Sequence, residues 1–459
     1  FTLLETPAAK ADKSSAASVR EAEIELNRSN FSDRKSLAIE VQLLDGKTYT
    51  ARRIAIDIRS LNDYTWFGRL GPGDENHVDV TLTFRDGKLA GSIFAPDRVY
   101  EIVPRGRRHF LAEIEQRLLP ECAGVEKTDA AFERENSSPA AGVDSGDRID
   151  VLVVYTTRTK TFLGGDSQAT ILSQQAIDAT NAAYFNSIVR QRVHLVNAVE
   201  FVYVETGNSS TDLTNLRASV AVQALRDLHK ADLVAMIGEF TDVCGRGYLG
   251  GSAGAASIGF SLTARSCAVG NLSLAHELGH NMGSHHNPEN GSGAFFPFGY
   301  GHYVNGSFRT IMSYTDPCTQ GCPKRPYFSN PGVLSGGVST GIEGSRDNAR
   351  SLNGTADSVA NYRYSGQSIT LSTFHATGDL LRGVNRNLSW SSDSVGGNVR
   401  IDWSRDEGVS WTTLVPTTAN DGSETIVVSD RPSRRGRLRI VSLDAPIVSD
   451  SSIANLSLR

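Results

Sequence analysis

Hydrophobic and polar residues alternate along the first part of the chain and again along its last part. In the first part, strand-like runs are separated by Asp45-Gly46 and Asp86-Gly87, and Asp-Gly pairs favour tight hairpin turns. In the last part, runs such as NVRIDW and RLRIVS alternate with turn residues. We therefore expect a β-rich unit over residues 1–122 and a β-sandwich over residues 365–459.

The middle of the chain has a different pattern. The runs IDVLVVY and DLVAMIG are continuously apolar, as in strands that are buried on both faces. Apolar residues recur every three or four positions over 169–183, and a second helical pattern follows over 213–231, which predicts two helices. Because strands and helices alternate, we expect an α/β domain over residues 148–364. The predicted fold class is multidomain α+β.

Two segments have no periodic pattern. Residues 123–147 are small, charged or turn-forming, which predicts a linker that a protease can cleave. About 20 residues at the N-terminus are small and polar, and we expect a mobile leader there. The chain starts with Phe1, as expected where a secretory signal or another leading piece has been removed.

Composition narrows the function classes. The 459 residues suffice for about three domains at ~150 residues each, and no apolar run approaches the ~18 residues of a membrane-spanning helix. The net charge of −5 gives no overall reason for binding to nucleic acid or to an anionic membrane. We therefore expect neither nucleic acid nor a membrane among the partners.

The chemistry concentrates in the run HELGHNMGSHH. His276 and His280 are one helical turn apart, so both imidazoles can bind one ion from the same helix face. Gly283 can take positive φ and turn the chain so that His286 returns as a third ligand. Three imidazoles with an open fourth position describe a catalytic zinc site, and Glu277 is placed as general base.

Three neighbouring residues have alternative interpretations. His285 could replace His286 as a ligand, but the spacing favours His286 and a place for His285 at the rim. Met312, in the run TIMSY, could be an ordinary core residue, but its place downstream of the histidine motif favours a thioether floor below the ligands. Tyr314 is either a second catalytic residue or a packed core tyrosine. The Gly-rich residues 247–260 are expected to form the upper edge of a cleft that holds an extended peptide.

HELGHNMGSHH together with TIMSY resembles the metzincin zinc endopeptidases, most closely their reprolysin (adamalysin) branch. The resemblance covers residues 148–364 and implies Zn²⁺ as the cofactor, His276, His280 and His286 as its ligands, and Met312 as the residue of the Met-turn. Tyr314 corresponds to an oxyanion-stabilising tyrosine of related families. Asn287 departs from the reprolysin pattern, which has Asp there. The sequence leaves calcium binding open.

A weaker resemblance is to the secreted bacterial peptidyl-Asp metalloendopeptidases. It implies that Lys324 or Arg325 could receive an acidic substrate side chain. An endopeptidase implies protein or peptide substrates. The run VDVTLTFRDGKLAGSIF is similar to secreted reprolysin-like propeptides, which implies a β-rich prodomain that acts as an inhibitor. The C-terminal residues resemble the fibronectin type III-like or Ig-like modules of secreted hydrolases, with Trp390, Trp403 and Trp411 as core anchors; an adhesive role and a spacer role are both open.

Cysteine spacing bears on compartment and latency. Four of the five cysteines lie in the middle domain, and the simplest of three pairings is Cys244–Cys267 with Cys318–Cys322, in an oxidising compartment. Cys122 remains, just before the linker. A thiolate there could occupy the open zinc position in the latent form, as in metzincin zymogens, although LPECAGV does not match the matrixin switch motif. The alternative is a buried or dimer-forming cysteine.

The sequence thus predicts a secreted, extracellular zinc endopeptidase that is made as a latent zymogen and that hydrolyses internal peptide bonds through zinc-activated water with Glu277 as base. The competing function class is a secreted binding or toxin-like module that keeps the fold with little proteolysis. Every catalytic group that the resemblance requires is present, which favours the enzyme.

Overall fold

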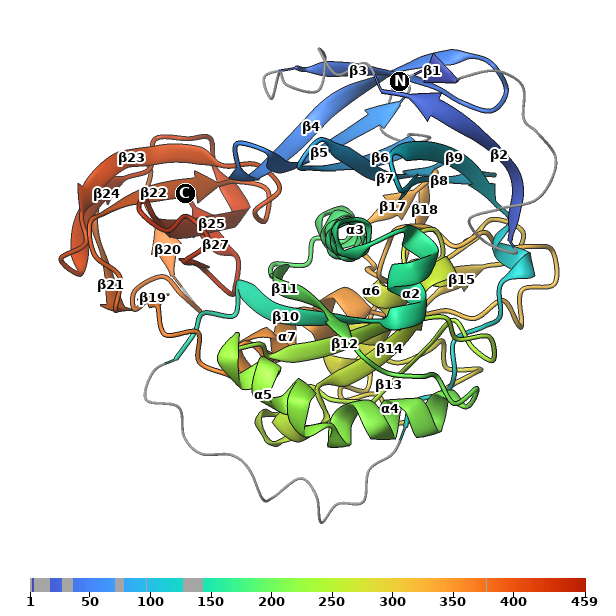
Figure 1. The fold of residues 1–459 in the computed structure, drawn as a ribbon. Coiled ribbons are helices and arrows are strands. Elements are labelled where there is room, and N and C mark those ends of the chain that lie inside the picture. The colour runs from blue at the N-terminus through green and yellow to red at the C-terminus, as the bar shows by residue number, and fades with distance from the viewer. Residues whose placement is uncertain are drawn as a thin grey trace.

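The structure is a computed structural model that describes residues 2–3, 17–26, 36–70, 78–95, 97–126, 143–376 and 378–459. The N-terminal residues form one large sheet, the middle residues form a sheet covered by helices, and the C-terminal residues form two further sheets (Figure 1). The predicted mixed α/β class with large β-rich parts is confirmed. Among the described residues, no helix is long and apolar enough to cross a bilayer.

The N-terminal sheet is antiparallel and has the strand order β1-β2-β9-β8-β7-β6-β5-β4-β3. Its strands are β1 (Thr2–Leu3), β2 (Ser18–Glu25), β3 (Ala38–Gln42), β4 (Thr48–Ser60), β5 (Asp63–Leu70), β6 (Val78–Arg85), β7 (Lys88–Phe94), β8 (Val99–Arg105) and β9 (Arg108–Ile114). Asp86 and Gly87 have φ values of 48° and 75°, which suits a two-residue hairpin turn. The expected mobile leader is wrong for β1 and the start of β2; residues 4–16 lie outside the described residues.

The central sheet has the order β11-β10-β12-β14-β13. Its first four members, β11 (Arg192–Phe201), β10 (Arg148–Thr156), β12 (Leu233–Gly238) and β14 (Phe260–Ala264), are parallel. The edge strand β13 (Gly245–Gly247) runs antiparallel to β14. The outer side of β13 has no partner strand within this five-stranded sheet.

Helices cover this sheet and differ from the sequence-based expectation in detail. They are α2 (Thr157–Leu163), α3 (Asp166–Asn186), α4 (Ser209–Ala218), α5 (Val220–Leu228), α6 (Ser273–Asn281) and α7 (Asn348–Val359), with short 3₁₀ turns at Gln116–Leu118, Ala253–Ile258 and Arg265–Cys267. The single helix expected over 213–231 is wrong. Ser219 is extended and its side chain caps Val222 N–H, so α4 ends there and α5 begins. Helix α2 was not predicted.

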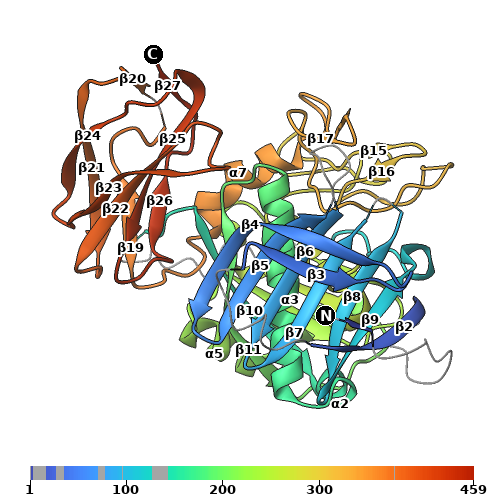
Figure 2. The same cartoon turned by 90° about the horizontal axis from the view of Figure 1, so that it is seen from above.

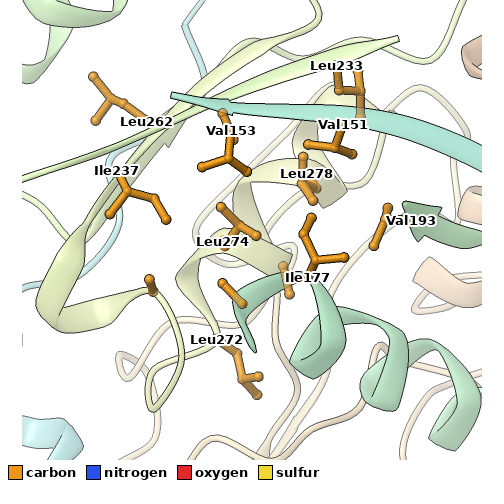
Figure 3. Packing of buried hydrophobic residues seen from close by; sticks show 14 of the residues in the cluster. Val151, Val153, Ile177, Val193, Leu233, Ile237, Leu262, Leu272, Leu274 and Leu278 are labelled. Carbon is orange, nitrogen blue, oxygen red and sulfur yellow. The ribbon is translucent and has the colours of Figure 1, made fainter. Parts of the chain in front are cut away.

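Helix α6 packs below the central sheet. Leu274 and Leu278 face Val151 and Val153 of β10, and all four side chains are buried (Figure 3). The two valines are two positions apart and therefore point to the same face of the strand. Ile177 brings α3 into the same cluster. This apolar packing fixes α6 against a rigid sheet.

The C-terminal residues form a three-stranded and a six-stranded sheet around one core. The strands are β19 (Ser368–Leu371), β20 (Asp379–Leu380), β21 (Asn385–Asp393), β22 (Asn398–Ser404), β23 (Thr412–Ala419), β24 (Ser423–Val427), β25 (Ser433–Ser442), β26 (Ser449–Ser451) and β27 (Leu456–Leu458). Trp390 and Trp403 are buried in this core. Trp411 is not part of it and lies instead under the guanidinium of Arg439, with 4.2 Å from that group to the ring centroid.

The N-terminal sheet lies over α3, as Figures 1 and 2 both show. The contact is polar and buried: Thr65 and Thr83 donate hydrogen bonds to the Asp178 carboxylate at 2.5 and 2.6 Å. Arg59 lies 3.4 Å from the same carboxylate. The N-terminal sheet is therefore attached to the face of the central domain that carries α3.

Candidate metal centre and cleft

Helix α6 ends in a turn that returns the chain to the helix face. Gly283 has a φ of 85°, its N–H donates to His280 O, and Ser284 N–H donates to Gly279 O, both at 2.9 Å. These two bonds form a Schellman motif, which requires a residue with positive φ at Gly283. The residues that follow, up to His286, therefore come back beside His276 and His280.

The three histidines meet at one point. Their Nε2 atoms are separated by 3.2 Å for His276 and His286, 3.1 Å for His276 and His280, and 3.0 Å for His280 and His286. A tetrahedral ion with ligands at about 2.0–2.1 Å would space its nitrogens by about 3.3 Å. All three side chains are buried. The spacing therefore fits a small divalent cation.

The hydrogen bonds of the rings support this fit. His276 Nδ1 lies 2.8 Å from Ile311 O and His280 Nδ1 lies 2.8 Å from Ser284 O. A carbonyl oxygen only accepts, so each Nδ1 carries the proton. Burial lowers the pKa of both rings, that of His280 to about 3, so the rings are neutral. Their Nε2 lone pairs face each other at short range, an arrangement that a bound cation stabilises.

Glu277 lies next to this cluster, and two glycines make room for it. Its side chain is fully buried, and neither carboxylate oxygen accepts a well-formed hydrogen bond from a described residue. A Cβ at Gly245 would lie 2.3 Å from Glu277 Oε1, and one at Gly247 would lie 3.1 Å from Oε2. Burial raises the pKa of Glu277 to about 8. The carboxylate thus stands close under β13, in a position that favours proton uptake.

Met312 lies directly below the ligand helix. Its side chain is fully buried, and a Cβ at Gly279 would come within 2.7 Å of its sulfur. Ile311, the preceding residue, supplies the carbonyl that orients His276. The segment around Met312 therefore both packs against α6 and fixes one of the histidine rings.

Tyr314 lies beside the cluster. Its ring centroid is 4.1 Å from that of His286, and its hydroxyl donates a 2.7 Å hydrogen bond to Cys122 O. Its backbone N–H donates to the Asn287 side chain at 3.1 Å. Tyr314 is thus partly exposed and directed at a main-chain carbonyl, rather than packed fully into the core.

His285 is not one of the three converging rings. The expectation of a rim position is wrong, because its side chain is only 4% exposed. Its Nδ1 accepts a hydrogen bond from His286 N–H at 2.8 Å. The residue therefore stabilises the return of the chain toward the cluster from inside the protein.

Residues 121–126 lie along the edge strand β13. Ala123 N–H donates to Gly245 O at 2.8 Å, Glu126 N–H donates to Gly247 O at 3.1 Å, and Cys244 N–H donates to Glu121 O at 3.2 Å. The pairing at Glu126 is parallel. The peptide-binding edge predicted for residues 247–260 is therefore right only at its start: the extended chain pairs with β13 and Tyr248, whereas Ala253–Ile258 form a 3₁₀ helix.

Cys122 is the free cysteine, and it is buried next to the cluster. Its Sγ lies within 4.8 Å of a ring nitrogen of His276 and a carboxylate oxygen of Glu277, but it does not share that distance with all three histidines. The thiol donates to Ser273 Oγ at 3.6 Å. Burial and the Glu277 charge raise the pKa of the thiol. Cys122 thus faces the proposed base and one proposed ligand.

Of the two cations expected to receive an acidic side chain, only Lys324 faces the cleft. It is 2% exposed, burial lowers its pKa to about 8, and Cys122, Glu121 and Glu277 act on it electrostatically. Arg325 points to the N-terminal sheet, where it donates to Ala95 O at 2.6 Å. Residues 324 and 325 therefore face opposite sides.

The structure contains the disulfides Cys244–Cys267 and Cys318–Cys322. The first joins the residue before β13 to the turn that leads toward α6. It therefore links the edge strand to the part of the chain that carries the ligands. The second lies in the segment that follows Tyr314.

Several residues of this site were not identified from the sequence. Gly245 and Gly247 are two glycines two positions apart on the edge strand, which indicates a close approach of another group. Nothing in the sequence indicates that this group is the Glu277 side chain. Arg309 and Thr315 carry no recognisable motif. Glu121 is adjacent to Cys122, yet only the structure shows that its side chain enters the cleft.

The chain is similar to known metallopeptidases. The model of metallo-peptidase family M12 matches residues 145–329. A peptidyl-Asp metalloendopeptidase of Xanthomonas campestris pv. campestris is 30% identical over 347 residues, which cover 71% of this chain and 82% of that protein. One of Stenotrophomonas maltophilia is 30% identical over 361 residues, covering 71% and 83%. A third, of Pseudomonas aeruginosa, is 29% identical over 246 residues, covering 47% and 40%.

Proposed function

The chain belongs to metallopeptidase family M12, and we propose that it is a zinc-dependent endopeptidase made as a latent, secreted precursor. It is a metalloendopeptidase by its relatives. The single observation that carries the zinc site is the convergence of three neutral imidazoles within 3.0–3.2 Å of each other beside a buried carboxylate. A binding or toxin-like module would not need this carboxylate, and the relatives are named as endopeptidases.

His276, His280 and His286 would hold the ion. When bound, Zn²⁺ supplies a Lewis acid that acidifies water and polarises a peptide carbonyl. Glu277 accepts the proton of the attacking water and passes it to the leaving amine. Burial raises its pKa in the latent chain, and such an environment favours the uptake of a proton.

Main-chain groups of the edge strand β13 would bind the substrate peptide. The edge strand β13 offers N–H and C=O groups that residues 121–126 occupy in the latent form. Tyr314 already donates to a main-chain carbonyl at this place, which supports a role in stabilising the oxyanion of the substrate. Met312 and Gly283 hold the ligands in position. From the names of the relatives we propose that cleavage occurs at aspartyl residues.

Latency rests on the N-terminal part of the chain. Residues 1–122 act as the prodomain, and residues 123–147 as the linker that is cleaved on activation; residues 127–142 lie outside the described residues. Cys122 is the residue that would supply the fourth ligand in the latent form. The two disulfides support an oxidising, extracellular location. Residues 365–459 form an accessory module.

The test is Glu277→Gln in the linker-cleaved chain. The carboxamide has the same shape but cannot accept the proton, so we expect hydrolysis of a protein substrate to fall by ~10³-fold, within the usual range for a general base. Zinc content, measured by elemental analysis, stays at one ion per chain. Glu343→Gln, at an exposed position of the same domain, is the matched control. Unchanged cleavage by Glu277→Gln, or a metal-free wild-type protein, would overturn the proposal.

A further inference from the structure

Two buried cationic side chains lie side by side at the cleft. Arg309 is 4% and Lys324 is 2% exposed, and their main chains pair directly. Arg309 donates to Ser313 O at 2.9 Å, and its Nε has no hydrogen-bond partner among the described residues. The acidic groups that act on this pair are Glu121, Cys122 and Glu277. Two of these three belong to the segment that precedes the linker.

The Glu121 side chain points into this place. Its Oε1 accepts hydrogen bonds from Thr315 N–H at 3.0 Å and from the Thr315 hydroxyl. Burial alone would raise the pKa of Glu121, but the charges of Arg309 and Lys324 and the bonds from Thr315 hold it below its ordinary value. The carboxylate is therefore ionised and stabilised by groups of the catalytic domain.

The main chain of the same segment occupies the peptide-binding edge. Glu121 O accepts from Cys244 N–H, and Ala123 N–H donates to Gly245 O. The next carbonyl along the chain, that of Cys122, accepts from Tyr314. Glu121 and Cys122 thus lie along β13 as an extended peptide does, with the Glu121 carboxylate bonded to Thr315 and under the electrostatic influence of the two cations.

We propose that Arg309, Lys324 and Thr315 form the carboxylate-binding pocket of the enzyme and that Glu121 fills this pocket in the latent chain in place of the acidic side chain of a substrate. The inference rests on the proposed function and deepens it, since it assigns the residues that select the substrate. Arg309 thus takes the role that the sequence-based expectation gave to Arg325, because Arg325 faces the N-terminal sheet.

Electrostatics favours this assignment over a purely structural role. Removal of residues 121–126 would leave two buried cations close together with Glu277 as the remaining acidic neighbour. Buried like charges without a counter-ion are costly, so the pocket favours an anionic occupant. A planar guanidinium and a backbone N–H next to a hydroxyl are suited to a carboxylate.

The first test measures the accessibility of Cys122 in the full-length, zinc-loaded chain. The other four cysteines are disulfide-bonded, so a thiol reagent reports on this residue alone. Glu121→Gln keeps the shape but removes the charge, and we expect labelling to become at least tenfold faster, equivalent to about 1.4 kcal/mol. Glu115→Gln, on the exposed side of the same segment, is the control and should match the wild type. Equal rates for Glu121→Gln and wild type would overturn the proposal.

A double-mutant cycle distinguishes a direct interaction of Glu121 with the pocket from independent destabilisation of residues 121–126 by each substitution. Lys324→Met also accelerates labelling when Glu121 is present, but it adds little when Glu121 is already Gln. If the two effects simply add, Glu121 and Lys324 do not interact and the pocket is wrong. Both variants are judged by labelling alone, so this result does not depend on whether the chain is active.

The second test uses the linker-cleaved chain and two peptides that differ only by Asp or Asn at the cut site. We expect Lys324→Met to reduce the ratio of their kcat/KM values at least tenfold. An Asp preference that survives Lys324→Met would overturn the pocket while leaving the proposed function intact. If the wild type cleaves neither peptide, the proposed function fails, and the labelling cycle still decides whether Glu121 is bound by the pocket.

Discussion

Replacement of Gly245 by alanine should disable the enzyme without removing its metal. A Cβ at this position would lie 2.3 Å from Glu277 Oε1 and 2.7 Å from its Cγ. A relaxed carbon–oxygen contact needs about 3.3 Å, so the carboxylate must move by about 1 Å. The backbone does not oppose the change, because Gly245 is not among the glycines with positive φ. The overlap with Glu277 is thus the main consequence.

The expected magnitude follows from this displacement. A misplacement of about 1 Å of a reacting group can cost ~10²-fold in rate. We therefore expect kcat/KM of the linker-cleaved Gly245→Ala variant to fall by ~10²-fold, with zinc content unchanged. Gly247→Ala serves as the graded control: its Cβ would lie 3.1 Å from Oε2, so a shift of only a few tenths of an ångström suffices and the loss should be several-fold at most.

The assay is hydrolysis of a quenched fluorescent peptide, with elemental analysis and thermal unfolding on the same samples. Full activity of Gly245→Ala would refute the reasoning, because Glu277 could then act from a different position than the one under β13. Loss of zinc together with activity would also refute it, since the overlap would then have disturbed the ligands rather than the base.

Two further predictions concern the prodomain. Cys122→Ser should raise the activity of the full-length chain at least tenfold, because a hydroxyl is a far weaker zinc ligand than a thiolate. The same peptide assay on uncleaved chains measures this activity. Unchanged activity would contradict the proposed role of the thiol. Glu101 accepts a hydrogen bond from Gly270 N–H, and burial raises the pKa of its carboxyl to about 7. Between about pH 4.5 and 7 the folded chain therefore keeps a proton that the unfolded chain loses. The free energy of unfolding falls as the pH rises through this range. Glu101→Gln should therefore raise the free energy of unfolding at pH 8, by on the order of 3 kcal/mol at most, and leave it nearly unchanged at pH 4.5. Thermal unfolding at the two pH values measures it, and an equal shift of the melting temperature at both would contradict this origin.

The sequence predicted the parts of the site that depend on local spacing. His276 and His280 share a helix face because of the helical repeat, and Gly283 is required by the turn that follows, so both could be inferred from a few neighbouring residues. The buried strands of the central sheet were identified for the same reason. The break between α4 and α5 was missed because Ser219 is compatible with a helix interior by sequence and acts as a cap only through its backbone conformation.

The pocket could not be inferred in this way. Arg309 lies 15 residues before Lys324 and almost 190 after Glu121, and the three meet only because the segment after Tyr314 returns beside β16 (Phe308–Arg309). The choice between Lys324 and Arg325 depends on which face each side chain takes, and the irregular chain around them has no period from which a face can be read. Contacts of this kind depend on tertiary packing rather than on local pattern.

In the zymogen that we propose, the position of the linker has a consequence for activation. Residues 121–126, which lie along β13, are on the N-terminal side of residues 127–142, so a cut within residues 127–142 would leave them joined to the N-terminal sheet. That sheet is itself fixed to α3 through Asp178, whose carboxylate accepts from Thr65 and Thr83. Cleavage removes only the covalent tether and with it the high effective concentration of the segment. The cleft is uncovered when the contacts at α3 and at β13 are lost together, and each contact therefore delays the release of the other.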